Sequence, residues 1–402
     1  MKRRAIFNIF FWIFISVAVV VTGVSLSMRG GRDLNVGLYG VDQVLHGKSP
    51  YENISDTNRP LFRYAPGMAI LQAPFLLKSK KVEPILYYGI PITFKDMLPS
   101  IYAWYLAELA AITLSALILL RLIPPSTKEE GARNLKISLL LSMPFLLYEL
   151  SNSQNKLVAL FFMLAALLLF KKSRMFFSAV FFCLAVTVYS PLLVFILYFI
   201  LKSRGRFIPW FTAGVFIVFF LVPSAVFGVG FNNYLLKEWF ERTIKPFSTA
   251  ASYVNYLDLR ASNQSLPGAV GRLLVPGGTE NYLYLVSPVL IHLIIRACSA
   301  AIVLLSCIAA WKNSKEASQG LVYSVFLMLA LMLPQYCIYY TWAWTFVFYL
   351  VALNLKDKSL LTACAALFIS TCLVGVPFFK NISLIFWTTF VLWGTMVKAA
   401  LR

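Results

Sequence analysis

Long, uninterrupted runs of apolar residues constrain this chain more than any other feature of its sequence. The first extends from Ala5 to Met28, and comparable runs recur as far as the C-terminus. A helix needs about 20 apolar residues to cross the hydrocarbon core of a bilayer, where no water satisfies unpaired backbone groups. Because the runs are continuous rather than alternating in polarity, they predict helices and not barrel strands. We therefore expect an all-α, polytopic membrane protein with about a dozen transmembrane helices.

The composition and the charge distribution agree with a membrane location. Hydrophobic residues make up 60% of the chain and charged residues 13%, whereas soluble domains have about 45–50% and about 25%. The net charge of +20 comes largely from Lys and Arg clusters between apolar runs, which is typical of cytoplasmic loops. These features exclude a soluble enzyme and favour the lipid bilayer over nucleic acid as a partner. All six cysteines lie within apolar runs without a CxxC pair, so neither disulfides nor structural zinc is expected.

The basic clusters also predict the orientation of the chain. A basic triplet at residues 2–4 precedes an apolar run that is too long for a signal peptide and lacks a cleavage site, so we expect a retained first helix. Both termini are expected in the cytoplasm, with 1–402 forming a single integral domain of the cell membrane. Two long loops, at about 29–100 and about 228–281, are expected on the extracytoplasmic face.

Two pairs of short apolar runs lie between these loops. The four arms are Ile137–Leu150, Leu157–Phe170, Met175–Val188 and Leu192–Leu201. Each has about 10–14 residues, or about 15–21 Å of helix, which is short of a ~30 Å hydrocarbon core. Since basic clusters flank each pair, we predict two hairpins whose polar tips form the floor of a recess in the outer leaflet. One long kinked span per pair is the alternative.

The first long loop begins with an amphipathic segment from Asp33 to Gly47. Its apolar stripe consists of Leu34, Leu38, Val41 and Leu45, and its polar stripe of Asn35, Tyr39, Asp42 and His46. Such a helix is expected to lie flat on the outer membrane surface, with its polar face toward the recess. The later run Gly67–Leu77 is too short to span and is expected to be interfacial or re-entrant.

Several motifs occur in a fixed order along the chain. They are Asp33-Leu34-(x)4-Tyr39-(x)7-Gly47-(x)2-Pro50-Tyr51, Phe62-x-Tyr64-x-Pro66, Ser153-Gln154-Asn155, Ser190-Pro191, and Ser262-Asn263-Gln264-Ser265-Leu266 with Arg272. Together they resemble glycosyltransferase family 87, a group of membrane mannosyl- and arabinosyltransferases of the GT-C superfamily. The resemblance implies a GT-C-like helical bundle. The sequence departs from the family in lacking a Lys at the second hairpin tip. It also has Tyr339 and Tyr340 after Pro334, where a His is often found.

The resemblance implies a chemistry as well as a fold. Family members take a sugar from a polyprenyl phosphate and pass it, with inversion, to a glycolipid or glycan acceptor on the outer face; mannose is the favoured sugar. Phosphate is a good leaving group, so the reaction needs one carboxylate base and cations for the phosphate. The chain has no Asp-x-Asp pair and no Gly-rich phosphate loop, which argues against a nucleotide-sugar donor, an obligatory metal or another cofactor.

Three carboxylates are candidates for the base. Asp33 matches the family's first-loop Asp, although it could instead serve only as a helix N-cap. Asp42, on the same helix, is the runner-up, and its alternative role is that of a solvated surface charge. Glu149, at the first hairpin tip, is the third candidate and could otherwise be a boundary charge.

Other polar residues are candidates for binding. The substrate-binding candidates are Tyr39, Tyr64, Asn155, Asn263 and Gln264. His292 and Arg296 lie four residues apart on one helical face within an apolar run, where ionisable groups are commonly functional, so we expect them to bind phosphate. Arg260 and Arg272 are the alternative phosphate ligands in the second loop. All four could otherwise be interface anchors or ordinary surface charges.

Two other functions remain open from the sequence. A transporter or flippase of lipid-linked sugars would need ionisable residues near the middle of several helices, and His292 and Arg296 are the main ones noted. An inactive scaffold with the GT-C fold is consistent with the missing hairpin Lys and late His.

Overall fold

The computed structural model describes residues 2–29, 32–52, 62–77, 94–125, 127–245, 257, 259–274, 287–313 and 318–402. Helices dominate this part of the chain, and the extended backbone that it contains pairs only at Asn263 and Ile338. Five helices are long and apolar enough to cross a membrane, or six spans if one bent pair counts as a span. The all-α, polytopic prediction is therefore confirmed, while the count of about a dozen helices and the two long loops stay predictions.

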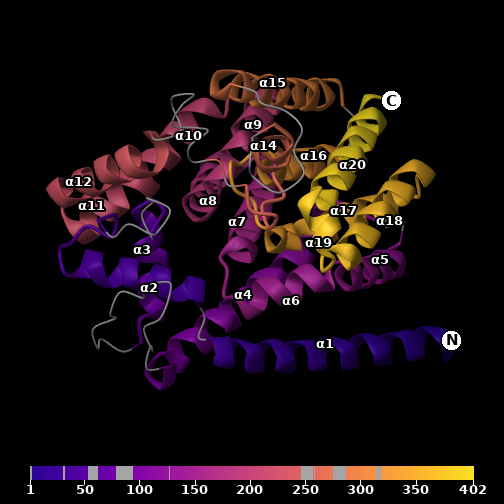
Figure 1. Ribbon diagram of the computed structural model, residues 1–402, viewed down its shortest axis with the longest axis horizontal. Helices are drawn as coiled ribbons and strands as arrows, with labels where there is room; N and C mark the ends of the chain where they lie inside the picture. Colours follow the sequence, from indigo (N-terminus) through magenta and orange to yellow (C-terminus); the bar gives the residue numbers. More distant parts are fainter. Residues whose placement is uncertain are drawn as a thin grey trace.

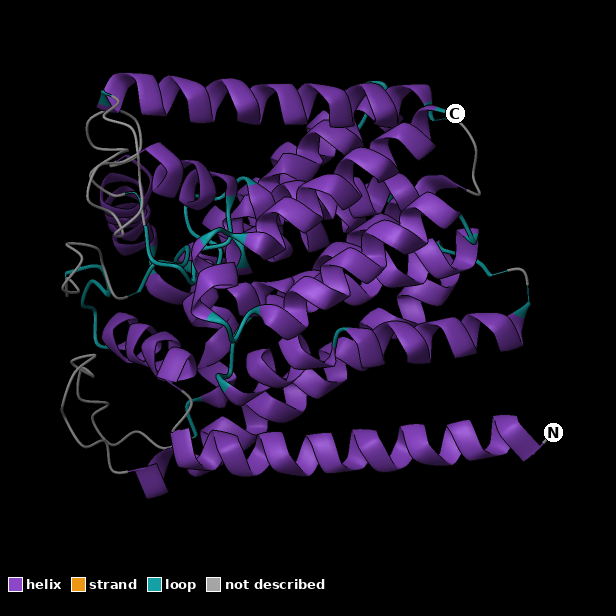
Figure 2. Cartoon of the chain, turned by 45° about the vertical axis from the view of Figure 1, so that its right-hand side comes forward, coloured by secondary structure: helices purple, strands orange, loops and turns teal. Residues whose placement is uncertain are grey.

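The long helices form the frame of the bundle. They are α1 (Lys2–Arg29), α4 (Phe94–Leu122), α15 (Pro288–Lys312) and α20 (Leu384–Leu401). In both views α1 and α15 lie along opposite edges of the molecule, with the shorter helices between them (Figures 1 and 2). Apolar side chains cover α1 nearly all round, and many of them, including Ile9, Trp12 and Val20, stay exposed. Such a surface is suited to hydrocarbon and not to water.

A further candidate span, Ile208–Phe227, is irregular because of a proline. It comprises α10 (Ile208–Val215), the π-helical η3 (Phe216–Leu221) and α11 (Val222–Phe227). Pro223 has no N–H to donate to the carbonyl of Phe219, four residues earlier. The amide of Asn232 donates to that carbonyl instead, at 3.2 Å, and Asn232 is fully buried. A distant side chain thus satisfies the backbone group that the proline leaves unpaired.

The first predicted pair of arms is present as α6 (Met143–Ser151) and α7 (Lys156–Lys171). The chain bends by 115° between them, which excludes a straight span and is consistent with either a re-entrant hairpin or one sharply broken span. One boundary differs from the sequence prediction, because α5 (Lys128–Leu141) occupies part of the expected cytoplasmic loop. Thr127 caps α5 by accepting the N–H of Glu130 at 3.2 Å, and acidic residues fill the first turn, both of which favour a helix start.

The second pair of short runs forms α8 (Met175–Val188), then η2 (Ser190–Val194) and α9 (Phe195–Ser203). The bounds of α8 coincide with the predicted arm. The two pairs pack against each other through α7 and α8, where the hydroxyl of Ser178 donates to the carbonyl of Ala166 at 2.8 Å. The polar tips of both pairs therefore belong to one packed unit.

The amphipathic segment of the first loop is α2 (Arg32–Leu45). Its predicted apolar stripe is buried except for Leu45, but Asn35 and Tyr39 of the polar stripe are also buried, being 1% and 4% exposed. The reason is close packing on α3 (Gly67–Gln72) and the loop before it: a Cβ at Gly37 would overlap the amide of Gln72, and one at Gly40 the ring of Phe62. Protein therefore covers much of the face predicted to look into the recess.

The region predicted as a second long loop contains helices. These are α12 (Val229–Trp239), the π-helical η4 (Phe240–Ile244) and α14 (Leu266–Leu274). The indole of Trp239 donates to the carbonyl of Arg63 at 3.2 Å, and the hydroxyl of Tyr234 to the carboxylate of Glu52 at 3.4 Å. The two loop regions therefore contact each other directly.

The C-terminal third forms the most deeply buried part of the bundle. Its elements are α16 (Gln319–Met332), η7 (Tyr339–Trp344), α17 (Thr345–Leu355), α18 (Lys358–Leu373) and α19 (Pro377–Asn381). Every residue of α16 from Gly320 onward is buried, as is α17 as far as Ala352. The short η1 (Ala73–Phe75) follows α3 on the opposite side of the hairpins.

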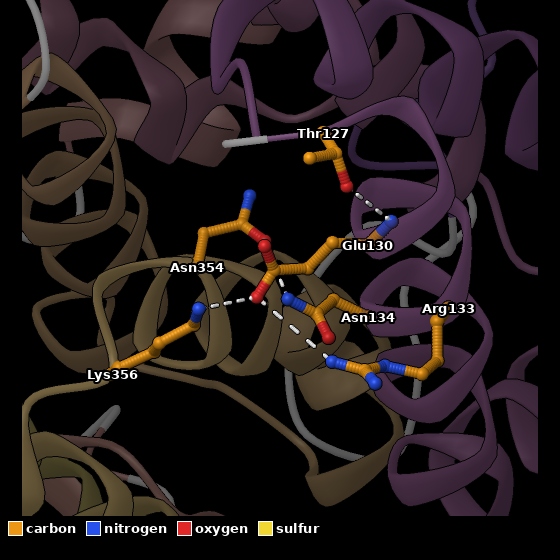
Figure 3. Close-up of polar contacts among 6 residues, drawn as sticks. All are labelled: Thr127, Glu130, Arg133, Asn134, Asn354 and Lys356. Carbon is orange, nitrogen blue, oxygen red and sulfur yellow. Dashed lines mark hydrogen bonds and ion pairs between the residues drawn. The ribbon is translucent and has the colours of Figure 1, made fainter.

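A polar strut joins α5 to the end of α17. It comprises Thr127, Glu130, Arg133, Asn134, Asn354 and Lys356 (Figure 3). The carboxylate of Glu130 accepts from the ammonium of Lys356 at 2.7 Å and lies 3.9 Å from the guanidinium of Arg133. The amide of Asn134 donates to that of Asn354 at 2.9 Å. The hydrogen bond from Lys356 holds the pKa of Glu130 below its usual value.

Candidate active site

The tip of the α6–α7 hairpin is closed by a buried carboxylate. Glu149 is 0% exposed, and its Oε1 accepts the backbone N–H of Lys156 at 2.9 Å. This bond caps the N-terminus of α7, where a negative charge is favoured by the helix dipole. The other oxygen, Oε2, has no hydrogen-bond partner among the residues described. One oxygen of Glu149 therefore stabilises the hairpin tip, and the other makes no hydrogen bond with the residues described.

Lys156 brings its ammonium to the junction of the two hairpins. The ammonium lies 4.7 Å from the ring centroid of Tyr189, at the tip after α8. The indole of Trp344 donates to the carbonyl of Lys156 at 2.9 Å and packs edge-on against Tyr189 at 5.5 Å. The hydroxyl of Tyr189 donates to the carbonyl of Ala330 at 3.1 Å. The ring of Tyr189 thus faces the cation, and Trp344 holds both Tyr189 and the backbone of Lys156 in place.

The first loop brings Tyr64 and Asp33 to the same tip. The hydroxyl of Tyr51 donates to the carbonyl of Tyr64 at 2.8 Å, which fixes the loop. Burial raises the pKa of the Tyr64 phenol, the negative charge of Asp33 raises it further, and a hydrogen bond with Asn155 lowers it. The negative charge of Asp33 also interacts electrostatically with Glu149 and with Lys156, so Asp33 lies near both of these groups.

Asp33 lies in the first turn of α2, which begins at Arg32. It therefore lies inside the helix and not at the N-cap position expected from the sequence. Its side chain is half-buried. Nearby, the amide of Gln72 donates to the amide oxygen of Asn155 at 3.4 Å, which ties α3 to the hairpin tip.

A cavity of 560 Å³ opens beside this cluster. Its walls come from the first loop, both hairpin tips, η4, α15 and the segment 333–336. In the described lining, the charged residues are Arg63, Lys156 and Arg296, all of them cationic. The Nε of Arg296 donates to Nε2 of His292 at 3.1 Å. Three cations without a carboxylate in the lining create a positive potential that suits a multiply charged anion such as phosphate.

The structure brings some of the predicted residues together and leaves others aside. Tyr64 and Arg296 line the cavity, and Asn155 and Asp33 lie close to Tyr64. His292 is not among the cavity-lining residues and instead contacts Arg296.

Asp42 and Tyr39 belong to other parts of α2. The carboxylate of Asp42 lies 3.4 Å from Nδ1 of His46, and neither residue is in the cavity lining. Tyr39 is buried and is not among the lining residues either. The structure therefore separates the runner-up base from the three cations.

The second-loop residues have a different environment. The Asn263 amide donates to the carbonyl of Gln335 at 2.9 Å and accepts the N–H of Cys337 at 2.9 Å. The Gln264 amide donates to the carbonyls of Ala261 and Lys380. The bonds of Asn263 brace the segment 333–338, part of which lines the cavity, while those of Gln264 join the second loop to the end of α19.

Arg272 is 1% exposed and its guanidinium is surrounded by backbone carbonyls. It donates to those of Arg260 at 2.7 Å, Asn263 at 2.7 Å and Asn381 at 3.0 Å, and to the hydroxyl of Ser383. The expected phosphate ligand is therefore placed as a buried brace outside the cavity lining. Arg260, the other loop candidate, stacks on Tyr336 at 5.3 Å, and Tyr336 does line the cavity.

Sequence reasoning missed two of the three cations. Lys156 directly follows the polar tip motif, and a search for the first basic residue after that tip would have found it. Arg63 lies between Phe62 and Tyr64 of the first-loop motif, so that motif could also have identified it as a candidate phosphate ligand. Which of the many basic residues share one cavity depends on packing, for which the sequence carries no local signal.

Apolar candidate spans, the polar tips of two helix pairs and a cation-lined cavity define a multi-pass membrane protein with a cavity suited to an anionic ligand. The chain belongs to glycosyltransferase family 87, whose family model matches residues 62–334. No curated protein matches the chain with significant similarity. Family membership makes the chain a membrane glycosyltransferase, which acts on a sugar donor and an acceptor. The match includes both hairpins and Arg296 but begins after Asp33.

Proposed function

We propose that the protein transfers a sugar, with mannose as the first choice, from a polyprenyl phosphate to a glycolipid or glycan acceptor on the extracytoplasmic face of the cell membrane. The observation that carries the proposal is the cavity in which Arg63, Lys156 and Arg296 converge next to the acidic group of Asp33. A lipid phosphate supplies the anion and the sugar supplies the electrophile. The orientation rests on the basic clusters of the sequence.

The position of Arg296 supports a lipid-linked donor over a soluble one. Arg296 is exposed on α15, a candidate span whose neighbouring Val289, Leu290 and Leu293 are exposed apolar residues. A phosphate held by Arg296 would keep its prenyl chain in the bilayer beside these residues. Arg can hold a phosphate through two parallel hydrogen bonds, which a Lys cannot do.

Asp33 is the proposed base. The acceptor hydroxyl gives its proton to the Asp33 carboxylate, its oxygen forms a bond to the anomeric carbon, and the bond from that carbon to the phosphate oxygen breaks. The phosphate leaves with the electron pair, and the single displacement inverts the anomeric configuration. The half-exposed position of Asp33 favours it over Glu149, which is fully buried and caps α7.

Replacing Asp33 by Asn tests this assignment in a transfer assay with polyprenyl-phosphate mannose. The Asp33→Asn variant should lose about 10²–10⁴ in turnover, the usual contribution of a general base, and should still bind the donor. The same change at Asp42, which pairs with His46, is the matched control and should leave turnover near normal. The reverse outcome would assign the base to Asp42.

One observation favours a transporter as the second candidate. Glu108 lies on α4, a candidate span, and is fully buried, with no partner for either carboxylate oxygen in the described part of the chain. Ionisable residues at membrane depth often mark a transport path. A flippase would lose lipid-sugar translocation in proteoliposomes on Glu108→Gln and keep it on Asp33→Asn. A transferase would lose sugar transfer on Asp33→Asn.

A further inference from the structure

A second cavity lies on the other side of the hairpin, between α1 and the bundle. This trough has a volume of 440 Å³ and is lined by apolar residues of α1, α4, α5 and α6, with Lys136 as its charged residue among those described. Helix α1 forms one wall through residues such as Phe11, Ile15 and Val19. Figure 1 shows α1 along one edge of the molecule, so the trough lies at the periphery of the bundle.

The length of the trough matches one leaflet. Its α1 wall extends from Phe11 to Val19, which is about 12 Å at 1.5 Å per residue. Half of a ~30 Å hydrocarbon core is about 15 Å. The trough ends at Leu150, next to the Glu149 tip, which the sequence predicts as the floor of the recess in the outer leaflet. With the N-terminus in the cytoplasm, the trough therefore fits one acyl chain of the cytoplasmic leaflet.

A polar cavity of 740 Å³ continues the trough at the end nearest the N-terminus. The two cavities share Ala132 and Lys136, and the polar one is also lined by Asn8, Glu129, Glu130 and Arg133. It presents two basic and two acidic side chains close together. This polar cavity, which we call the mouth of the trough, complements a headgroup that carries both a positive and a negative charge better than a purely anionic headgroup.

Lys136 and Glu129 are the groups best placed to bind the headgroup. The ammonium of Lys136 donates to the side-chain oxygen of Asn8 at 2.6 Å and faces the rings of Phe11 and Trp12. An ammonium has three donors, so it can bind a phosphate in addition to Asn8. Glu130 pairs with Lys356, and Glu129 is exposed at the same cavity; a carboxylate has about four lone-pair sites, so Glu129 can accept from a ligand ammonium in addition to its contacts within the protein.

We propose that the trough binds one aminophospholipid of the cytoplasmic leaflet, with its phosphate on Lys136, its primary ammonium on Glu129 and one acyl chain between α1 and α6. A primary ammonium donates hydrogen bonds to a carboxylate, whereas the quaternary ammonium of a choline lipid has no N–H to donate. The site is therefore expected to select an ethanolamine headgroup. The proposal is independent of the sugar-transfer site.

The test is native mass spectrometry of the full chain in detergent, titrated separately with phosphatidylethanolamine, phosphatidylcholine and phosphatidylglycerol that carry the same acyl chains. One phosphatidylethanolamine should remain bound with several-fold preference over the other two lipids. Lys136→Ala should weaken that binding by about tenfold or more, as the loss of a charge-assisted hydrogen bond implies. Glu129→Gln should remove the preference over phosphatidylcholine.

Three further variants keep the test decisive. Lys136→Arg retains the charge and should retain the lipid, which guards against a fold defect in the alanine variant. Ala116→Phe fills the trough and should exclude the lipid without changing the mouth. Lys398→Ala, an exposed cation outside both cavities, should have no effect. Equal retention of the three lipids, tighter binding of phosphatidylglycerol, or an unchanged Lys136→Ala variant would each overturn the proposal.

Discussion

The polar strut and the cation-lined cavity use charge in opposite ways. In the strut, the acid Glu130 lies between two bases: Arg133 on the same helix, α5, and Lys356 at the end of α17, so that the pair with Lys356 joins the two helices (Figure 3). In the cavity, three bases from separate segments converge, and the described lining contains no acid. Like charges brought together repel one another, and the acids near Lys156, which are Asp33 and Glu149, lie outside this lining, so the cavity itself favours an anion.

The difference indicates which polar groups serve the fold and which serve a ligand. Exposed ion pairs such as those of the strut contribute little to stability, because water and salt screen them. Buried cations that donate to several carbonyls, as Arg272 does, contribute more to stability. Cations that line a cavity should contribute to binding and little to stability. Each class predicts a different response to substitution.

The largest effect on stability should come from Arg272→Ala. Its removal leaves several buried carbonyls without a donor, and each unsatisfied buried group costs about 1–3 kcal/mol. We expect a large fall in the melting temperature of the detergent-solubilised protein, and Arg260→Ala, at an exposed position, is the control. An unchanged melting temperature with lost binding of polyprenyl phosphate would place the phosphate site in the second loop.

Arg296→Ala should affect binding and not stability. A charge-assisted hydrogen bond contributes roughly 1.5–3 kcal/mol, so the affinity for a polyprenyl monophosphate should fall about tenfold to a hundredfold. Arg296→Lys should lose part of the affinity, because a Lys cannot bind in the two-pronged manner of Arg. Arg133→Ala in the strut is the matched control. If both alanine variants bind equally well, Arg296 is an interface anchor.

Lys156→Met should weaken binding of the same lipid by about tenfold, the lower end of the range for a charge-assisted bond. Met keeps an apolar stem against the ring of Tyr189 and leaves the backbone bonds to Glu149 and Trp344 intact. The melting temperature should therefore change little. The matched control is Lys356→Met, which should leave lipid affinity unaltered. A collapse of stability in the Lys156 variant would make that cation structural.

The strut itself should give the smallest effects. Asn134→Ala removes the hydrogen bond to Asn354 and should cost about 0.5–1.5 kcal/mol of stability without altering lipid affinity. Because Lys356 lowers the pKa of Glu130 in the folded state, the contribution of Glu130 is present above the unfolded pKa and is lost as the pH falls through the folded pKa. The wild type should therefore lose more stability on acidification than Glu130→Gln. Parallel melting curves would contradict this.

The sequence predicted what depends on local pattern and missed what depends on distant packing. The bounds of α8 and the apolar stripe of α2 follow from runs and periodicity, and the structure has both. The role of Arg272 could not be read in the same way, because two of its acceptors, at Asn381 and Ser383, lie more than a hundred residues away in the chain.

The candidate site shows the same division. Tyr64 and Asn155 were found from motifs, and the structure brings them together. The position of Lys156 in the cavity depends on the ring of Tyr189, which comes from the other hairpin. The spacing of residues within one segment therefore could not predict that Lys156 lines the cavity. The helices α12 and α14 were missed because both are short and lie in a region of mixed polarity.

The lack of a side chain at Gly37 and at Gly40 helps to set the position of the proposed base, Asp33, because it lets α2 pack closely on its neighbours. Gly37 and Gly40 allow α2 to approach Gln72 and Phe62 closely: a Cβ at Gly40 would overlap the ring of Phe62, and one at Gly37 would displace the flexible amide of Gln72. Asp33 belongs to the same helix, so a displacement of α2 would move its carboxylate away from the hairpin tip. A misplacement of about 1 Å can reduce a reaction rate about a hundredfold. Two glycines outside the cavity lining therefore influence the geometry of the proposed reaction through the position of α2.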